Sequence, residues 1–261
     1  VDIEYSESIL ELADKVIGSR NALSLGWHYR SRHTSLIDFS NFYFYNNKLT
    51  VFASNKVGSQ IVHKPIKYSQ YRGGVNLPEV KAVMDALLEQ IKIDKEKSII
   101  IATMNQQQES ELRLALDSEL STNKMLRDFE NKFQGNLDEL TVKKLEDIQG
   151  DERDVVIIST VYGPDANGKV TQMFGDINKA NGHRRLNVLF TRAKHKVILV
   201  TSLSSSDIKE SKREGPQILK KYLEYAEKGE LSDLEIKTSG NTENAFEESI
   251  RKALTNRGYL V

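Results

Sequence analysis

The 261-residue chain contains no cysteine, which excludes disulfides, thiol catalysis and cysteine-based zinc sites. No apolar run approaches the roughly 20 residues that a membrane-spanning helix needs, and no signal-peptide pattern opens the chain. Net charge is also absent, because 37 basic residues are matched by 37 acidic ones. The five histidines show no ligand spacing with carboxylates, so we expect no metal site. These absences favour a cytoplasmic protein without a membrane partner.

What is present describes a folded chain, since 39% of the residues are apolar and the length suffices for one large α/β domain or one domain with an appendage. The charges are unevenly placed. Basic residues dominate residues 24–72, and residues 179–196 contain no acid at all. On charge alone, a phosphate-binding face and a pair of solvated surfaces explain these two tracts equally well.

Hydrophobic periodicity predicts helices and strands in alternation. The predicted helices cover residues 9–17, 34–45, 78–91, 106–120, 184–193 and 216–228, with one more after residue 246. The predicted strands cover residues 97–103, 140–145, 154–162 and 196–202. This alternation predicts an α/β fold of three layers, in which helices cover both faces of a parallel sheet and a helical tail follows it.

Three segments combine residues that suit phosphate chemistry. Tyr29-Arg30-Ser31 can stack a base on the ring and place a guanidinium on a phosphate, although aromatic–arginine pairs are also common in cores and at surfaces. Gln149-Gly150-Asp151-Glu152 separates two strand-like runs, where a glycine allows close backbone approach to a ligand. Residues 184–194 contain Arg185, Val188, Leu189 and Arg192 at helical spacing, so a helix could direct an arginine outward. Each segment alone is weak.

In this order, the three segments resemble motifs IV, V and VI of superfamily 1 helicases. The resemblance covers roughly residues 23–202 and is closest to the large bacterial helicase-related proteins with an appended nuclease-like domain. It implies a RecA-like three-layer fold, the second motor domain of an ATP-dependent helicase, and a cleft for ATP shared with a missing N-terminal motor domain. That domain would carry the phosphate loop and would be the main holder of the Mg²⁺ ion.

The resemblance also implies roles for individual residues. Arg30 would reach the γ-phosphate, and Arg192 would be the arginine finger of the phosphoryl-transfer transition state. Nucleotide contacts would come from Tyr29 near the adenine, from Gln149 and Gly150 lining the cleft, and from Glu152 near the ribose. Single-stranded nucleic acid, more DNA than RNA, would be contacted by Thr103, Gln108, Thr141 and Lys143.

The resemblance and the composition together divide the chain. We expect an N-terminal helix leading from the missing motor domain at residues 1–22 and the second motor domain at 23–205. A helical extension at 206–229 and a polar linker at 230–244 would follow. Residues 245–261 resemble the opening of a restriction-endonuclease-like domain. The sequence is thus predicted to be a piece of a longer protein.

Two competing interpretations remain to be weighed. Residues 163–170 match the G-x-x-x-x-G-K pattern of a phosphate loop, but Val170 stands where serine or threonine must bind Mg²⁺, so we predict a turn instead. The chain could also be a nucleic-acid-binding module without motor function. A motor predicts that Arg30 and Arg192 meet at one edge of the sheet, together with Tyr29, Gly150 and Glu152, whereas a docking module would scatter them.

Overall fold

The computed structural model describes residues 9–17, 26–51, 58–231 and 255. The chain divides into two compact units, residues 1–230 and 231–261. Apart from residue 255, the predicted nuclease-like opening at 245–261 lies outside the described residues, and so does most of the predicted linker. The helices and strands between Ile9 and Lys228 all belong to the first unit.

A single sheet of five parallel strands forms the centre of this unit, in the order β1-β5-β4-β2-β3. Ile157 in the middle of β4 pairs with Ile101 of β2 on one side and with Ile198 of β5 on the other. All residues of β2 are buried, as expected of an apolar run covered on both faces. The strands are β1 (Ile61–Pro65), β2 (Ile99–Thr103), β3 (Thr141–Lys144), β4 (Arg153–Ser159) and β5 (Ala193–Thr201).

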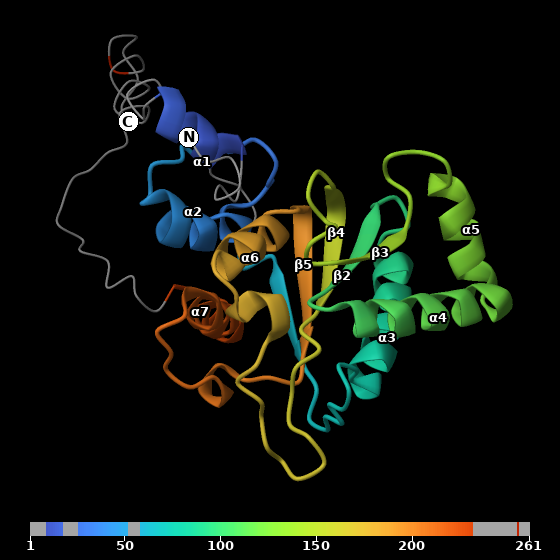
Figure 1. Cartoon of the computed structure of the whole chain (residues 1–261). Helices are drawn as coiled ribbons and strands as arrows, with labels where there is room; N and C mark the ends of the chain where they lie inside the picture. Colours follow the sequence, from blue (N-terminus) through green and yellow to red (C-terminus); the bar gives the residue numbers. More distant parts are fainter. Residues whose placement is uncertain (1–8, 18–25, 52–57, 232–254, 256–261) are drawn as a thin grey trace. The chain divides into compact units, whose positions relative to one another are not determined.

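Helices cover both faces of the sheet, with α3, α4 and α5 on one side and α2, α6 and α7 on the other (Figure 1). The first group packs its apolar residues onto β2, β4 and β5 in one continuous core. On the other side, the Phe190 ring of α6 stacks on Tyr222 of α7 with the centroids 3.5 Å apart. The α-helices are α1 (Ile9–Ile17), α2 (Asp38–Tyr45), α3 (Leu77–Ile93), α4 (Gln106–Thr122), α5 (Lys124–Phe133), α6 (Gly182–Phe190) and α7 (Glu214–Lys228).

The predicted three-layer α/β architecture is confirmed, but two elements were not predicted. Hydrophobic periodicity did not predict strand β1, because His63, Lys64 and Pro65 interrupt its apolar pattern. An edge strand tolerates such residues. Hydrophobic periodicity did not predict helix α5 either, because only three of its residues, Leu126, Phe129 and Phe133, are buried and the rest of its sequence is largely polar. These three recur on one face, and that face is enough to dock the helix on the core.

Two predicted elements end earlier than expected, and both differences matter for the site. Helix α6 ends at Phe190, so Arg192 lies in the turn before β5 rather than on the helix that the spacing predicted. Strand β4 ends at Ser159 rather than continuing to residue 162. Beyond it, Val161 has a φ of 68°, a conformation that is strained for a β-branched residue.

The strained turn after β4 is held by a buried carboxylate at the start of α3. Glu79 is fully buried and accepts hydrogen bonds from the backbone N–H groups of Val161 (2.8 Å) and Ser202 (2.7 Å). The hydroxyl groups of Ser159 (2.7 Å) and Thr160 (3.3 Å) also donate to it. Since no cation is among these partners, burial dominates and raises the pKa of Glu79.

The phosphate-loop-like stretch is a turn, as predicted. Residues Pro164 and Val170 form an antiparallel bridge, and Asp165 N–H donates to the carbonyl of Lys169 at 3.0 Å. The next helical element, at Gly175–Asn178, is a single 3₁₀ turn. These residues therefore form no phosphate cradle backed by a helix.

Candidate nucleotide-phosphate site

The segment with Tyr29 and Arg30 is fixed against the beginning of β5. The N–H of Arg32 donates to the carbonyl of Lys194 at 2.8 Å, and the Ser31 hydroxyl donates to the carbonyl of Ala193 at 3.2 Å. His28 accepts from the N–H of Ser31 at 3.0 Å, which closes the turn. Burial, and then the nearby Arg30, lower the pKa of His28 to about 4, so this ring is a neutral acceptor at pH 7.

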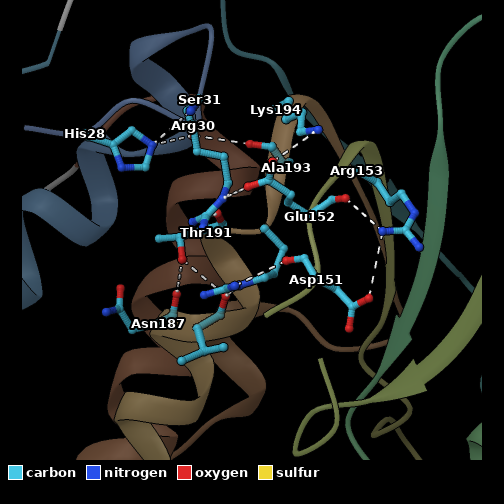
Figure 2. A network of polar contacts seen from close by, with 12 residues as sticks. His28, Arg30, Ser31, Asp151, Glu152, Arg153, Asn187, Thr191, Ala193 and Lys194 are labelled. Carbon is cyan, nitrogen blue, oxygen red and sulfur yellow. Dashed lines mark hydrogen bonds and ion pairs between the residues drawn. The ribbon is translucent and has the colours of Figure 1, made fainter. Parts of the chain in front are cut away.

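Arg30 is held on two sides by groups remote in sequence (Figure 2). Its Nε donates to a carboxylate oxygen of Glu152 at 2.8 Å, and its Nη1 donates to the carbonyl of Thr191 at 3.0 Å. The other oxygen of Glu152 lies 3.2 Å from Nζ of Lys194. The hydrogen bond from Arg30, followed by Lys194, keeps the pKa of Glu152 below its usual value. Glu152 therefore stays ionised and orients the guanidinium.

Arg192 is held by two backbone carbonyls. Its Nε donates to the carbonyl of Val188 at 2.7 Å, and its Nη1 donates to the carbonyl of Asp151 at 3.2 Å. Burial, and then the positive charge of Arg30, lower the pKa of Arg192. A guanidinium carries five N–H bonds, so three of them remain without a hydrogen-bond partner among the described residues. This geometry fixes the plane of the guanidinium and leaves donors for a ligand.

The charges at this place favour an anion. Arg30, Arg192 and Lys194 lie around the carboxylate of Glu152, and the carboxylate of Asp151, which pairs with Lys143, also acts on Arg192. Four cations against two carboxylates leave the local charge positive without a ligand. Planar guanidinium groups bind phosphoryl oxygens through parallel hydrogen bonds. The ring of Tyr29 is 74% exposed beside them, with its centroid 6.0 Å from Cζ of Arg30. The exposed ring can receive a base, while the guanidinium of Arg30 beside it can bind an attached phosphate.

The structure thus brings Tyr29, Arg30, Glu152 and Arg192 together at the amino ends of β4 and β5. The two arginines lie near each other at one edge of the sheet, which is the arrangement that the motor interpretation predicted. Gln149 and Gly150 lie on the exposed loop that leads to Glu152. Gly150 has a φ of 92°, and no atom lies within 4 Å of where its Cβ would be, so the glycine is needed for its backbone conformation. The proposed roles of these residues stay predictions.

Of the four residues predicted to contact single-stranded nucleic acid, two lie in the interior of the domain and two lie at its surface. Thr103 and Gln108 are fully buried, and the Gln108 side chain is bound to the backbone of Asn76 (2.8 and 3.2 Å) and to Ser159 (3.2 Å). A contact of these two side chains with nucleic acid would require this part of the fold to open. In contrast, Thr141 and Lys143 on edge strand β3 are partly exposed.

Sequence reasoning missed three contributors to the site. Lys194 and the carbonyl of Thr191 lie inside the third segment, but their proximity to Glu152 and Arg30 depends on tertiary structure. Asp151 was quoted in the second segment without a role, although its carbonyl binds Arg192. Its side chain accepts from Lys143 at 2.6 Å. Only the basic character of residues 179–196 gave a hint of Lys194.

Within the described ranges, no group of three or more histidine, aspartate or glutamate side chains could hold a metal ion. The described helices also include none that is long and apolar enough to cross a membrane.

The parallel sheet with helices on both faces defines an α/β domain of RecA-like fold, and two arginines lie at the amino ends of its strands β4 and β5. The family model described as "AAA domain" matches residues 59–204, more than half of the chain. The chain therefore belongs to this AAA domain family.

Two relatives are named as uncharacterised ATP-dependent helicases. The MG140 homologue of Mycoplasma pneumoniae is 34% identical over 217 residues, and MG140 of Mycoplasma genitalium is 33% identical over 218 residues. Each alignment covers 80% of this chain but 19% of the relative, so the chain spans about a fifth of the length of these proteins.

Among solved structures, the C-terminal domain of a possible DNA helicase from Lactobacillus plantarum WCFS1 is similar at 15% identity and a TM-score of 0.36. The match covers 66% of this chain and 88% of that one.

Proposed function

We propose that this chain is the C-terminal motor half of an ATP-dependent superfamily 1 helicase or translocase. The observation that carries the proposal is the meeting of Arg30 and Arg192 beside Glu152 at one edge of the sheet, although the three residues come from separate segments. Membership in the AAA domain family and the names of the two mycoplasma relatives support it.

In this proposal, ATP lies between this domain and an N-terminal motor domain of the same protein. Phosphoryl transfer needs a backbone cradle and a lysine for the phosphates, a bound Mg²⁺ and a positioned water. The N-terminal domain supplies these parts, including most of the ligands of the Mg²⁺ ion. Arg30 and Arg192 supply positive charge to the transferring phosphoryl group, and the exposed Tyr29 ring stacks near the adenine.

The loop that carries Gln149 and Gly150 lines the same cleft. Glu152 is proposed to contact the ribose while it orients Arg30, since 38% of its side chain is exposed. Closure of the two domains around ATP would bring these groups onto the nucleotide, and hydrolysis would release them. Such a cycle produces movement along a strand.

Single-stranded nucleic acid is the proposed second partner, DNA more than RNA, in the cytoplasm. Of the two partly exposed candidates on β3, Thr141 has a side chain with no hydrogen-bond partner among the described residues. We propose that it contacts a base or a sugar rather than a phosphate, because the hollow that it lines contains more carboxylates than cations. A non-catalytic binding module is the second candidate function. The two basic tracts, at residues 24–72 and 179–196, favour a binding module. Such a module gives no reason, however, for Arg30 and Arg192 to lie together.

The test is Arg192→Ala in the full-length protein. We expect kcat for ATP to fall by about 10³-fold or more, as for arginine fingers in general. Nucleotide affinity should change much less, because the interaction strengthens in the transition state. Arg184→Ala is the matched control, since this exposed arginine of α6 has no side-chain partner among the described residues. Equal turnover in the two variants would refute the motor proposal.

A further inference from the structure

The side chain of Asp151 connects edge strand β3 to the arginine site. Nζ of Lys143 lies 2.6 Å from one carboxylate oxygen of Asp151, and the side chains are 30% and 18% exposed. The carbonyl of the same residue accepts the hydrogen bond from Nη1 of Arg192 at 3.2 Å. The other carboxylate oxygen lies 3.8 Å from Nη1 of Arg153, so Lys143 and Arg153 anchor the side chain together, with Lys143 the closer of the two. The position of this carbonyl therefore depends in part on where Lys143 holds the side chain.

The surroundings of Lys143 do not favour a polyanion. Lys143 lines a hollow of about 490 Å³, to which Arg113 and Arg153 also contribute. The acidic residues in the same hollow are Asp117, Glu130, Glu139 and Asp151. Four carboxylates against three cations leave no excess positive charge for a phosphate backbone. The ammonium of Lys143 is thus already paired with the carboxylate of Asp151.

We infer that Asp151 and Lys143 are a pair of positioning residues for Arg192. Lys143 anchors the Asp151 side chain, and the Asp151 carbonyl fixes the guanidinium so that its remaining N–H groups can meet the phosphoryl oxygens. Lys143 then acts through the loop rather than by contacting nucleic acid. The inference rests on the proposed function, because it assigns a role toward the same arginine.

A neighbouring ion pair provides a matched control. Lys144, the next residue on β3, lies 3.7 Å from Asp147 in the same connection, and the two side chains are 25% and 57% exposed. Successive side chains of a strand point to opposite faces. Neither Lys144 nor Asp147 contacts the Asp151 carbonyl or Arg192 in the described structure.

The experiment compares Lys143→Met, Asp151→Asn and Lys144→Met in the full-length protein, with ATP turnover and the affinity for a fluorescent single-stranded DNA measured separately. We expect Lys143→Met and Asp151→Asn to lower kcat at least about fivefold at saturating ATP and strand, less than loss of Arg192 itself. Their strand affinity should change less than about twofold. Lys144→Met should resemble the unchanged protein, and Lys143→Arg should restore kcat because it keeps a cation at this place.

Weakened strand binding with unchanged kcat in Lys143→Met would overturn the inference and make this lysine a phosphate contact. Unchanged kcat in Asp151→Asn would overturn it as well. If Arg192→Ala turns over ATP like the unchanged protein, the proposed function fails instead, and the two failures are distinct. Lys143→Arg also separates misfolding from lost positioning, since the conservative variant should fold and turn over normally.

Discussion

Removal of the Glu79 carboxylate should be one of the most destabilising single substitutions in the domain. In Glu79→Ala, the backbone N–H groups of Val161 and Ser202 lose their acceptor while the surroundings stay buried. An unsatisfied buried donor costs about 1–3 kcal/mol, so the two together cost about 2–6 kcal/mol. The strained backbone of Val161 also loses its restraint. We therefore expect the free energy of unfolding to fall by about 2–6 kcal/mol.

Chemical denaturation of the chain, followed by circular dichroism, measures this change. Glu89→Ala is the control on the same helix, because Glu89 pairs with Lys64 at the surface with 58% of its side chain exposed. Removal of such a surface pair costs about 1 kcal/mol or less. A loss below about 1 kcal/mol in Glu79→Ala, or one equal to that in Glu89→Ala, would refute the account of the turn after β4.

Three further predictions concern charge and catalysis. Because burial raises the folded-state pKa of Glu79 above its ordinary value of 4.5, the stability that it contributes is complete below that value and is lost as pH rises through the raised pKa. Glu79→Gln should therefore flatten the decline in the denaturation midpoint as pH rises above 4.5. In the full-length protein, Glu152→Gln should lower kcat about fivefold, because Arg30 loses a charged acceptor, and should raise KM for ATP by less, because the amide still offers a hydrogen-bonding group to the ribose; steady-state kinetics that show a raised KM and constant kcat would contradict this. The isolated chain should hydrolyse no ATP, and a phosphate-release assay that found turnover, lost in Lys169→Ala, would restore the phosphate loop at residues 163–170.

The alternation of apolar runs was sufficient to predict most of the fold, because buried parallel strands such as β2 consist of uninterrupted apolar residues. It failed for α5, where Leu126, Phe129 and Phe133 provide a narrow apolar face in a polar sequence. Local pattern also could not show that α6 stops before Arg192, since the helical spacing of apolar and basic residues continues past its end.

The candidate site was predictable only in part. The order of three motifs pointed to Arg30 and Arg192, but no local signal showed that Glu152 bridges Arg30 and Lys194. The sequence also did not predict that Thr103 and Gln108 are buried, because both are polar residues. Their burial, and the hydrogen bond between Gln108 and Asn76, depend on tertiary contacts. Contacts between segments more than 100 residues apart must come from the fold itself.

If Arg192 acts on the phosphoryl group in the transition state, it should strengthen the binding of a transition-state analogue. The measurement is the affinity of the full-length protein for ADP with aluminium fluoride relative to ADP alone, with Mg²⁺ present. We expect the unchanged protein to bind the analogue much more tightly than ADP, and Arg192→Ala to lose at least about 10²-fold of this preference while its ADP affinity is nearly unchanged. An analogue preference that survives intact in Arg192→Ala would contradict the account.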